Sequence, residues 1–316
     1  MIWVVVALGL LGLAIWPFWR ESRLKKMDAL ARASAPGQFA HLSKGLTHYR
    51  WSGPKDGPVA ICIHGLTTPS YVWDGLTPAL VNMGYRVLSY DHYGRGFSDR
   101  PTGLQDRWFF LSHLDELLQD QGVDGQVTVL GYSMGGAVAT AFAAENSTRI
   151  KHIILLAPAG IRLPKLGWRA KLGLKPGIGD WMMRLIYDRM HRQGVKAERH
   201  LTTAVPGIVD RQLEELEYQG FVPAILSSYR GLISEDMHPD HQKIASARIP
   251  VLTVLGETDP LIPPSVAPLL EALNPHAIIR TINGAGHGLP YTHASDVIGY
   301  LDTFLGQPAA QTHDVD

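Results

Sequence analysis

The chain has 316 residues, of which 46% are hydrophobic and 18% are charged, and its 29 basic residues balance its 29 acidic ones. This composition is typical of a folded globular protein and excludes a largely disordered chain. The net charge of zero gives no electrostatic reason to expect a nucleic-acid partner. The single cysteine, Cys62, excludes an internal disulfide framework. It lies in the apolar run 58–63, so we expect it to be a core residue.

The first segment, residues 1–19, has no charged side chain and is nearly all apolar. About 18 helical residues span roughly 27 Å, which is just enough to cross the hydrocarbon core of a membrane. Tryptophans stand near both ends of the segment, where interfacial aromatic residues belong. We therefore predict a transmembrane anchor over residues 1–19. A cleaved signal peptide is the alternative, although no basic residue precedes the apolar run.

A basic segment follows the anchor, and we predict a linker helix over residues 20–38. Arg20, Arg23, Lys25 and Lys26 crowd its beginning. Positive flanks stay on the cytoplasmic side of a membrane, so the pattern predicts a cytoplasmic location for the rest of the chain. Export after cleavage of a signal peptide would reverse that location.

From about residue 39 onward, short apolar runs alternate with helical stretches. Apolar runs without alternating polar residues are typical of strands that are covered on both faces in a parallel sheet. Strands that alternate with helices predict a doubly wound, mostly parallel α/β sheet. The expected strands cover residues 46–51, 59–63, 85–90, 127–130, 153–156, 251–255 and 277–282, and clear helices cover residues 108–121 and 137–146.

The alternation stops between residues 160 and 247, where prolines recur and no convincing strand is found. The clearest helix of this stretch covers residues 180–190. We predict that residues 160–247 form a helical cap, inserted between the two parts of one core domain. Those parts are residues 39–159 and 248–308, and residues 309–316 are expected to form a tail.

The sequence Gly131-Tyr-Ser133-Met-Gly135 carries the strongest chemical signal of the chain. Glycines on both sides of a serine are weak evidence alone. Here the motif follows a predicted strand and opens a predicted helix, which is the setting of a strand–turn–helix nucleophile elbow. Flanking glycines leave room for the close-packed backbone around such a serine. We therefore predict that Ser133 is a nucleophile.

A serine hydroxyl needs a base within hydrogen-bond reach. His287 lies in a glycine-rich loop after the last predicted strand, where open α/β sheets place their sites, and is the predicted base. His293, in the same stretch, is the second candidate. The acid that orients the imidazole is predicted to be Asp259, in the loop after the strand at 251–255. Glu257 is its nearby rival.

Two backbone N–H groups are needed to stabilise the charge that develops on an attacked carbonyl oxygen. The N–H of Met134, directly after the predicted nucleophile, is one expected donor. The N–H of Leu66 is the other, in the loop that follows the strand at 59–63. His64 begins the same loop, and we interpret it as a residue that shapes the loop rather than as the base.

Two further patterns are explained without a ligand. His238-Pro239-Asp-His241 has a spacing found in metal sites, but the proline disturbs it and no further ligand cluster is visible, so a solvated turn is expected. Gly94-Arg-Gly96 lacks the third glycine of a dinucleotide-binding loop and is expected to form a turn. We predict neither a metal ion nor a cofactor.

Taken together, these residues resemble the capped serine-hydrolase branch of the α/β-hydrolase superfamily, over about residues 45–305. The likeness rests on His64-Gly65, Asp91-x-x-Gly94-Arg-Gly96-Phe-Ser98, Gly131-x-Ser133-x-Gly135, Asp259 and His287. The resemblance implies an α/β-hydrolase fold and the hydrolysis of carboxylic esters through an acyl-enzyme. With its anchor, the chain is similar to monoacylglycerol lipases and carboxylesterases, which implies a lipid-like or other small-molecule ester as the substrate.

Several alternatives share this arrangement. Hydrolysis of a carbon–carbon bond, thioester hydrolysis and acyl transfer use the same three residues. Dehalogenase and epoxide-hydrolase members carry aspartate where this chain has Ser133, which argues against both chemistries. A non-catalytic receptor on the same fold is the alternative from another class, because fold alone does not fix function. Deletion of residues 1–35 is expected to leave a soluble domain that keeps most of its activity on a soluble ester.

Overall fold

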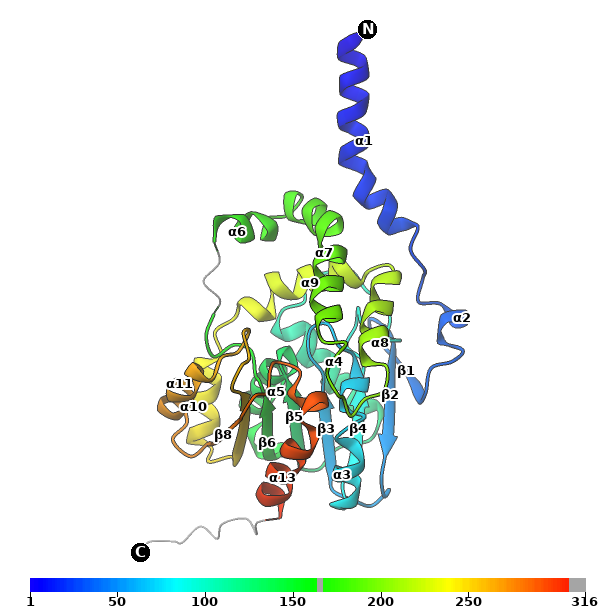
Figure 1. Cartoon of the computed structure of the whole chain (residues 1–316). Coiled ribbons are helices and arrows are strands. Elements are labelled where there is room, and N and C mark those ends of the chain that lie inside the picture. The colour runs from blue at the N-terminus through cyan, green and yellow to red at the C-terminus, as the bar shows by residue number, and fades with distance from the viewer. Residues whose placement is uncertain (164–166, 307–316) are drawn as a thin grey trace, which may run out of the picture.

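The computed structural model describes residues 1–163 and 167–306, so the predicted tail at 309–316 and the end of the predicted core lie outside the described residues. One eight-stranded sheet forms the centre of the molecule (Figure 1). Its strands are β1 (Gln38–Leu42), β2 (Gly45–Ser52), β3 (Val59–Ile63), β4 (Arg86–Tyr90), β5 (Val127–Tyr132), β6 (Ile150–Leu156), β7 (Val251–Gly256) and β8 (Ile278–Ile282).

The strand order is β1-β2-β4-β3-β5-β6-β7-β8. The pairs β1–β2 and β2–β4 are antiparallel, and every other neighbouring pair is parallel. The mostly parallel sheet confirms the prediction from the apolar runs, and each predicted run coincides with a strand, although β4 and β8 begin one residue later than predicted. The sequence did not indicate β1, because this edge strand is largely exposed and only Ala40 is buried in it.

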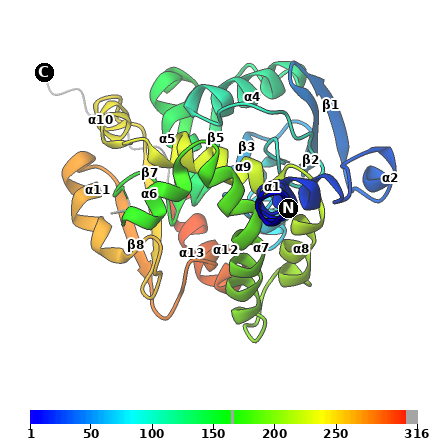
Figure 2. The ribbon, with the colours of Figure 1, turned by 90° about the horizontal axis from the view of Figure 1, so that it is seen from above.

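Helices cover both faces of the sheet and also extend above one of its edges (Figures 1 and 2). Side chains of α3 and α13 join the core cluster on one face, and those of α4 and α5 join the cluster on the other. The helices are α1 (Ile2–Ser22), α2 (Ala29–Arg32), α3 (Thr77–Asn82), α4 (Arg107–Asp120), α5 (Met134–Glu145), α6 (Trp168–Leu174), α7 (Ile178–Ala197), α8 (Ile208–Glu214), α9 (Phe221–Arg230), α10 (His238–Ser246), α11 (Ala267–Leu273), α12 (Leu289–Thr292) and α13 (Ala294–Leu305).

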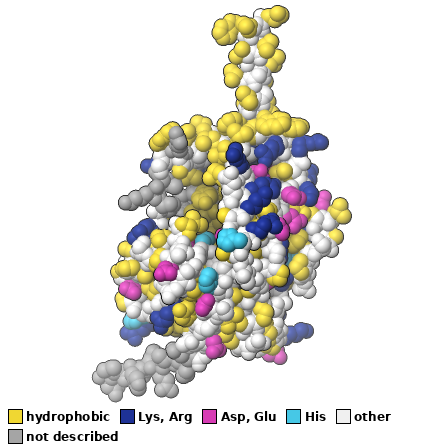
Figure 3. Space-filling view, viewed as in Figure 1, with side chains coloured by type: hydrophobic (Ala, Val, Ile, Leu, Met, Phe, Trp, Pro, Cys, Tyr) yellow, Lys and Arg dark blue, Asp and Glu magenta, His cyan; other side chains and the backbone are white. Residues whose placement is uncertain are grey.

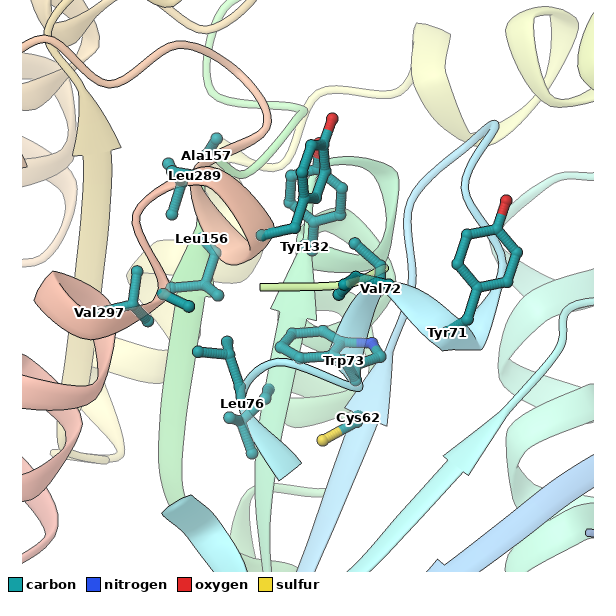
Figure 4. Close-up of a cluster of buried hydrophobic side chains, with 14 of the residues drawn as sticks. Cys62, Tyr71, Val72, Trp73, Leu76, Tyr132, Leu156, Ala157, Leu289 and Val297 are labelled. Atoms are coloured by element: carbon teal, nitrogen blue, oxygen red, sulfur yellow. The ribbon is translucent and has the colours of Figure 1, made fainter. Parts of the chain in front are cut away.

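The central strand β3 shows why the apolar runs are continuous. Ala60 and Cys62 belong to the cluster on the α3 side, whereas Ile61 and Ile63 belong to the cluster on the α4 side. A strand with a core on each face needs an apolar side chain at every position. Figure 4 shows Cys62 beside Trp73 in the first cluster, and Cys62 is fully buried, as predicted.

The helices between β6 and β7 divide into two groups. α6, α7, α8 and α9 lie above the carboxyl edge of the parallel strands (Figure 1). α10, which the prediction included in the cap, instead packs against α5 beside the sheet. Ile244 of α10 joins the same core cluster as α5. The apolar face of α10 belongs to the core. Because the sequence indicates no strand between α9 and β7, nothing in it distinguished α10 from the helices of the cap.

The linker helix predicted over residues 20–38 is wrong. α1 ends early in this segment, and the only further helix is the single turn α2. Between them the chain runs extended along the edge of the cap, where Lys25 forms a parallel bridge with Tyr218. The Lys25 N–H donates to the Glu217 carbonyl at 2.9 Å, and the Gln219 N–H donates to the Lys25 carbonyl at 2.8 Å. These pairings need an extended backbone, so they end the helix.

The N-terminal helix α1 projects from the rest of the molecule, with hydrophobic side chains around its surface (Figure 3). Among the described helices it is the one whose length and apolar composition would allow it to cross a membrane. Only 6% of the most apolar 18-residue stretch of α1 is buried against other parts of the protein.

Candidate active site

Ser133 stands at the sharp turn between β5 and α5, with a φ of 53° and a ψ of −118°. A positive φ is unfavourable for a residue with a Cβ and persists where the surrounding structure holds it. The Ser133 N–H donates to the Leu156 carbonyl at 3.0 Å. The Ser133 carbonyl accepts from the N–H groups of Gly136 at 2.9 Å and Ala159 at 3.0 Å. These bonds fix the serine in its strained conformation at the carboxyl edge of the sheet.

The glycines around Ser133 are required by space. A Cβ on Gly131 would overlap the carbonyl oxygen of Gly135, and a Cβ on Gly135 would overlap the carbonyl oxygen of Ile63. A Cβ on Gly65 would lie 3.3 Å from the Cβ of Ser133. The spacing of the motif therefore has a steric cause, because it lets the end of β3 and its loop pack directly against the serine turn.

The structure brings Ser133, His287 and Asp259 together in one chain of hydrogen bonds. His287 Nε2 lies 2.9 Å from Ser133 Oγ, and His287 Nδ1 lies 2.8 Å from Asp259 Oδ2. The other carboxylate oxygen of Asp259 accepts from the N–H groups of Leu261 at 2.8 Å and Ile262 at 2.9 Å. The Asp259 side chain is fully buried, so its carboxylate is held in one orientation behind the imidazole.

Neither rival residue lies in this chain of hydrogen bonds. Glu257 accepts a hydrogen bond from the Gly284 N–H at 2.8 Å, and it thereby holds the loop that carries His287. His293 precedes α13, and its Nδ1 lies 3.0 Å from the hydroxyl of Thr292. Both positions are explained by local structure.

Tyr132 is a residue of the site that the sequence did not reveal. Its hydroxyl donates to the His287 carbonyl at 3.1 Å, and its ring centroid lies 5.4 Å from that of the imidazole. It therefore supports the His287 loop from the strand that carries Ser133. The sequence feature that could have indicated this role of Tyr132 is its position directly before Ser133.

His64 is fully buried behind the site, between two loops. Its Nδ1 donates to the Gly65 carbonyl at 2.8 Å, and its Nε2 accepts from the His92 N–H at 2.8 Å. Burial lowers the pKa of His64 to about 4, so the ring stays neutral. With both ring nitrogens engaged, His64 joins the loops after β3 and β4.

A cavity of about 630 Å³ opens onto Ser133 and His287. Leu66 and Met134, whose N–H groups are the predicted oxyanion donors, line the same cavity. The rest of the wall is mainly apolar and comes from the segment after β6, from α9 and its following turn, and from the loop after β7. It includes Ile161, Leu163, Tyr229, Ile233, Leu261 and Val266.

Within residues 1–163 and 167–306, no group of three or more His, Cys, Asp or Glu side chains is arranged to hold a metal ion. The solvated turn expected at residues 238–241 is wrong, because these residues begin α10. A proline in the first turn of a helix has a suitable φ and no N–H to satisfy there. His238 Nε2 lies 2.6 Å from the Ile161 carbonyl, and His241 is buried.

Several curated proteins are similar to this chain in sequence. A putative non-heme chloroperoxidase of Synechocystis sp. is 27% identical over 258 residues, which cover 79% of this chain and 91% of that protein. A pimeloyl-(acyl-carrier protein) methyl ester esterase of Nitrosomonas europaea is 26% identical over 243 residues, covering 73% of this chain and 89% of that protein. A cis-3-alkyl-4-alkyloxetan-2-one decarboxylase of Xanthomonas campestris is 29% identical over 147 residues, which span 43% of this chain and about half, 49%, of that protein.

Solved structures show the same fold at low sequence identity. The enol-lactonase from Burkholderia xenovorans LB400 has a TM-score of 0.69 and 21% identity, and the match covers 85% of this chain and all of that one. The profile of the Alpha/beta hydrolase family matches residues 60–299, which include the serine turn and both of its partners. The chain is therefore an enzyme of the alpha/beta hydrolase family.

Proposed function

We propose that this protein is a serine hydrolase that cleaves carboxylic esters through an acyl-enzyme intermediate. The observation that supports it most is the 2.9 Å distance between Ser133 Oγ and His287 Nε2, with Asp259 behind the imidazole at 2.8 Å. A nucleophile, a base and an orienting acid in hydrogen-bond reach are what acyl transfer requires. A protein that only binds a ligand has no need for all three.

In the first half-reaction, His287 Nε2 takes the proton of the Ser133 hydroxyl while its oxygen attacks the ester carbonyl. The buried Asp259 carboxylate stabilises the imidazolium that forms. The N–H groups of Leu66 and Met134 hold the oxyanion of the tetrahedral intermediate. The intermediate collapses as His287 gives its proton to the leaving alcohol, and the acyl group remains on Ser133.

The second half-reaction repeats these steps with water. His287 takes a proton from the water, whose oxygen attacks the acyl-serine carbonyl. When this intermediate collapses, the proton returns to Ser133 Oγ and the carboxylic acid leaves. α5 begins directly after the serine, and the partial positive charge at the N terminus of a helix favours negative charge there.

A serine at position 133 also disfavours dehalogenation. A haloalkane dehalogenase of Mycobacterium marinum is 28% identical over 256 residues, covering 74% of this chain and 81% of that protein. Attack of a serine oxygen on a haloalkane would form an ether, which water cannot hydrolyse through an oxyanion intermediate. Attack on an ester forms a new ester, which water can hydrolyse.

The cavity favours an apolar acyl group. Its wall is mainly aliphatic, and a volume of about 630 Å³ accommodates a substrate of drug-like or monoacylglycerol size. Burial of each methylene group in such a wall contributes about 0.8 kcal/mol. We therefore infer a lipid-like ester, with monoacylglycerols as the first candidates.

We also infer that α1 anchors the enzyme in a membrane. α1 packs against the cap through α7, and Pro17 of α1 is buried. The Gly220 N–H of the cap donates to the carboxylate of Glu21 at 2.8 Å. A signal peptide destined for removal has no reason to make such contacts with the mature fold. The basic residues that follow the apolar segment favour a cytoplasmic catalytic domain.

The test is kinetic, on the full-length protein in detergent with a short p-nitrophenyl ester. Ser133→Ala and His287→Ala should each lower kcat by on the order of 10⁴ to 10⁶, and the double variant should be little worse, because the residues act as a unit. Thermal unfolding shows whether each variant is folded. A folded Ser133→Ala variant with more than about a tenth of wild-type activity would refute the proposal. A parallel panel of monoacylglycerols, thioesters and β-diketones identifies the preferred bond.

A further inference from the structure

The C-terminal part of the apolar helix α1 contacts the cap of the catalytic domain. The indole N–H of Trp181 in α7 donates to the Leu13 carbonyl at 3.0 Å. One turn further, the Arg184 guanidinium lies 4.8 Å from the ring centroid of Phe18. α1 and the first half of α7 therefore run side by side in the same direction, beginning at the level of Leu13 and Trp181.

This contact limits how α1 can enter a membrane. Only residues 2–12 extend beyond the level of Trp181, and at 1.5 Å per residue they reach about 16 Å. The hydrocarbon core of a membrane is about 30 Å thick, so this part alone cannot span it. Residues 13–19 must enter the membrane too. The rise from Trp19 to Leu13 is about 9 Å, so the beginning of α7 must enter to that depth.

The part of the cap that would enter is apolar on its surface. Leu185 and Ile186 of α7 are 39% and 41% exposed and lie within the stretch beside residues 13–19. Ile178 is 52% exposed and lies about one turn before Trp181, so it enters more deeply than they do. Figure 3 shows hydrophobic side chains gathered around the base of α1, with Lys and Arg side chains below them. Amphipathic helices in the membrane interface bury their apolar face by about 5–10 Å, which agrees with the depth that α1 imposes.

We propose that the cap is partly immersed in the membrane, with α6 and the first half of α7 in the interface beside residues 13–19 of α1, and that the active-site cavity receives its substrate from the lipid. The proposal rests on the anchor proposed above and goes beyond it, because an anchor alone would leave the cap in water.

The cavity is placed to benefit from this immersion. Tyr229 of α9 lines the cavity, and the adjacent Arg230 holds the corner between α6 and α7. Its guanidinium donates to the Leu174 carbonyl at 2.7 Å and pairs with the Asp180 carboxylate at 3.0 Å. Leu163, which also lines the cavity, is 43% exposed just before α6. An immersed α6–α7 corner therefore lies directly beside the cavity wall.

The test measures the depth of the cap in vesicles of phosphatidylcholine and phosphatidylglycerol. Cys62 is buried and is the chain's one cysteine, so an introduced cysteine is labelled selectively. Full-length Ile178→Cys is labelled with the fluorophore NBD, and Leu269→Cys on α11 is the matched control at an exposed leucine away from the cap. Doxyl-labelled lipids should quench the label at position 178 roughly threefold more strongly than the label at position 269.

Two different failures are distinguishable. If the protein floats with the vesicles but the two labels are quenched equally, the cap stands clear of the membrane and the proposal is overturned. If the protein does not float with the vesicles, the anchor itself is refuted, and this proposal falls with it while the ester hydrolase assignment stands.

A second arm tests delivery of the substrate. In full-length protein, Ile178→Glu combined with Ile186→Glu should lower turnover of a monoacylglycerol in vesicles by roughly tenfold, because charged side chains resist burial in the interface. Turnover of a soluble p-nitrophenyl ester should not change, which shows that the variant is folded. Leu269→Glu should change neither activity. Equal turnover of the vesicle substrate by the double variant and the wild type would contradict delivery from the lipid.

Discussion

The carboxylate of Asp91 lies directly against the Cα of Gly96, so that a Cβ on this glycine would overlap Asp91 Oδ2. The same carboxylate accepts from the N–H groups of Ser70 at 2.8 Å and Phe97 at 3.0 Å and contacts His48 Nδ1 at 2.7 Å. Burial disfavours the charged carboxylate, but His48 and the hydrogen bonds hold the pKa of Asp91 well below its usual value. Asp91 thus ties the turn after β4 to the segment after β3.

Gly96→Ala should destabilise the fold strongly for this reason. Gly96 has a φ of +52°, and Gly122 has a φ of +64° with no atom within 4 Å of a built Cβ. Gly122→Ala therefore measures the cost of the backbone conformation alone, about 1 kcal/mol. Gly96→Ala adds the overlap with Asp91 and should lower the free energy of unfolding by about 3 kcal/mol or more. Chemical unfolding in detergent measures both, and equal losses would show that the contact with Asp91 is unimportant.

A buried carboxyl group of the cap lies on the other side of the same turn. Glu215 accepts from the Gly96 N–H at 3.0 Å, and the Arg100 guanidinium lies 3.5 Å away. Burial raises the pKa of Glu215 from 4.5 to about 7, although Arg100 opposes the shift. The folded protein therefore holds this proton at pH values where the unfolded chain has lost it.

The stability of the protein should depend on pH through Glu215. Because the folded state binds more protons between pH 4.5 and pH 7, its free energy of unfolding should fall as the pH rises through this window, by up to about 3 kcal/mol. Glu215→Gln should remove this part of the pH dependence, whereas Glu214→Gln, at the exposed neighbouring position, should keep it. Unfolding curves at several pH values measure the slope, and an unchanged slope in Glu215→Gln would exclude this residue as its source.

The N-terminal segment contacts the folded domain, so the length of an N-terminal deletion should affect stability. Lys25 pairs with the cap edge, and the Arg32 guanidinium donates to the Phe97 carbonyl at 2.9 Å and pairs with Asp99. Deletion of residues 1–35, which the sequence predicts to leave a soluble domain with most of its activity on a soluble ester, removes all of these contacts. We now expect that deletion to lower the unfolding temperature by roughly 5 °C or more, and deletion of residues 1–12 to change it little. Equal unfolding temperatures of the two truncated proteins would show that the segment does not support the fold.

The choice of the acid is tested by exchanging each carboxylate for an amide. Asp259→Asn keeps the shape of the side chain but removes the charge behind His287 and favours the wrong tautomer, so kcat should fall by about 10⁴. Glu257→Gln should retain most activity, because this side chain contacts the loop at Gly284 rather than the imidazole. Steady-state turnover of a soluble ester decides between them. A neutral Asp259→Asn together with an inactive Glu257→Gln would assign the acid to Glu257 instead.

The sequence revealed those features whose causes are local. Buried strands are recognisable because every position of β3 faces a core, and the serine turn is recognisable because Gly131 and Gly135 leave no space for a Cβ. The features that it missed depend on distant contacts. The segment around Lys25 is extended because it pairs with Glu217 and Tyr218 of the cap, and Glu217 lies 192 residues further along the chain. No periodicity near residue 25 could indicate that pairing.

The same reason explains the misplaced boundary of the cap. α10 packs on α5 through Ile244, and only the folded arrangement shows that its apolar face meets the core. The supporting residues of the site, Tyr132 and Glu257, also act through contacts with the distant loop at residues 283–288. The reactive residues were thus easier to predict than the residues that hold them in place.

The central claim is that Ser133 is an activated nucleophile, and covalent labelling tests it most directly. The full-length protein is treated with a fluorophosphonate, which reacts rapidly only with a serine activated by a neighbouring base. Peptide mass spectrometry should locate the adduct on Ser133, and His287→Ala should abolish rapid labelling although Ser133 is still present. Rapid labelling at another residue, or equally fast labelling of Ser133 in the His287→Ala variant, would contradict the account.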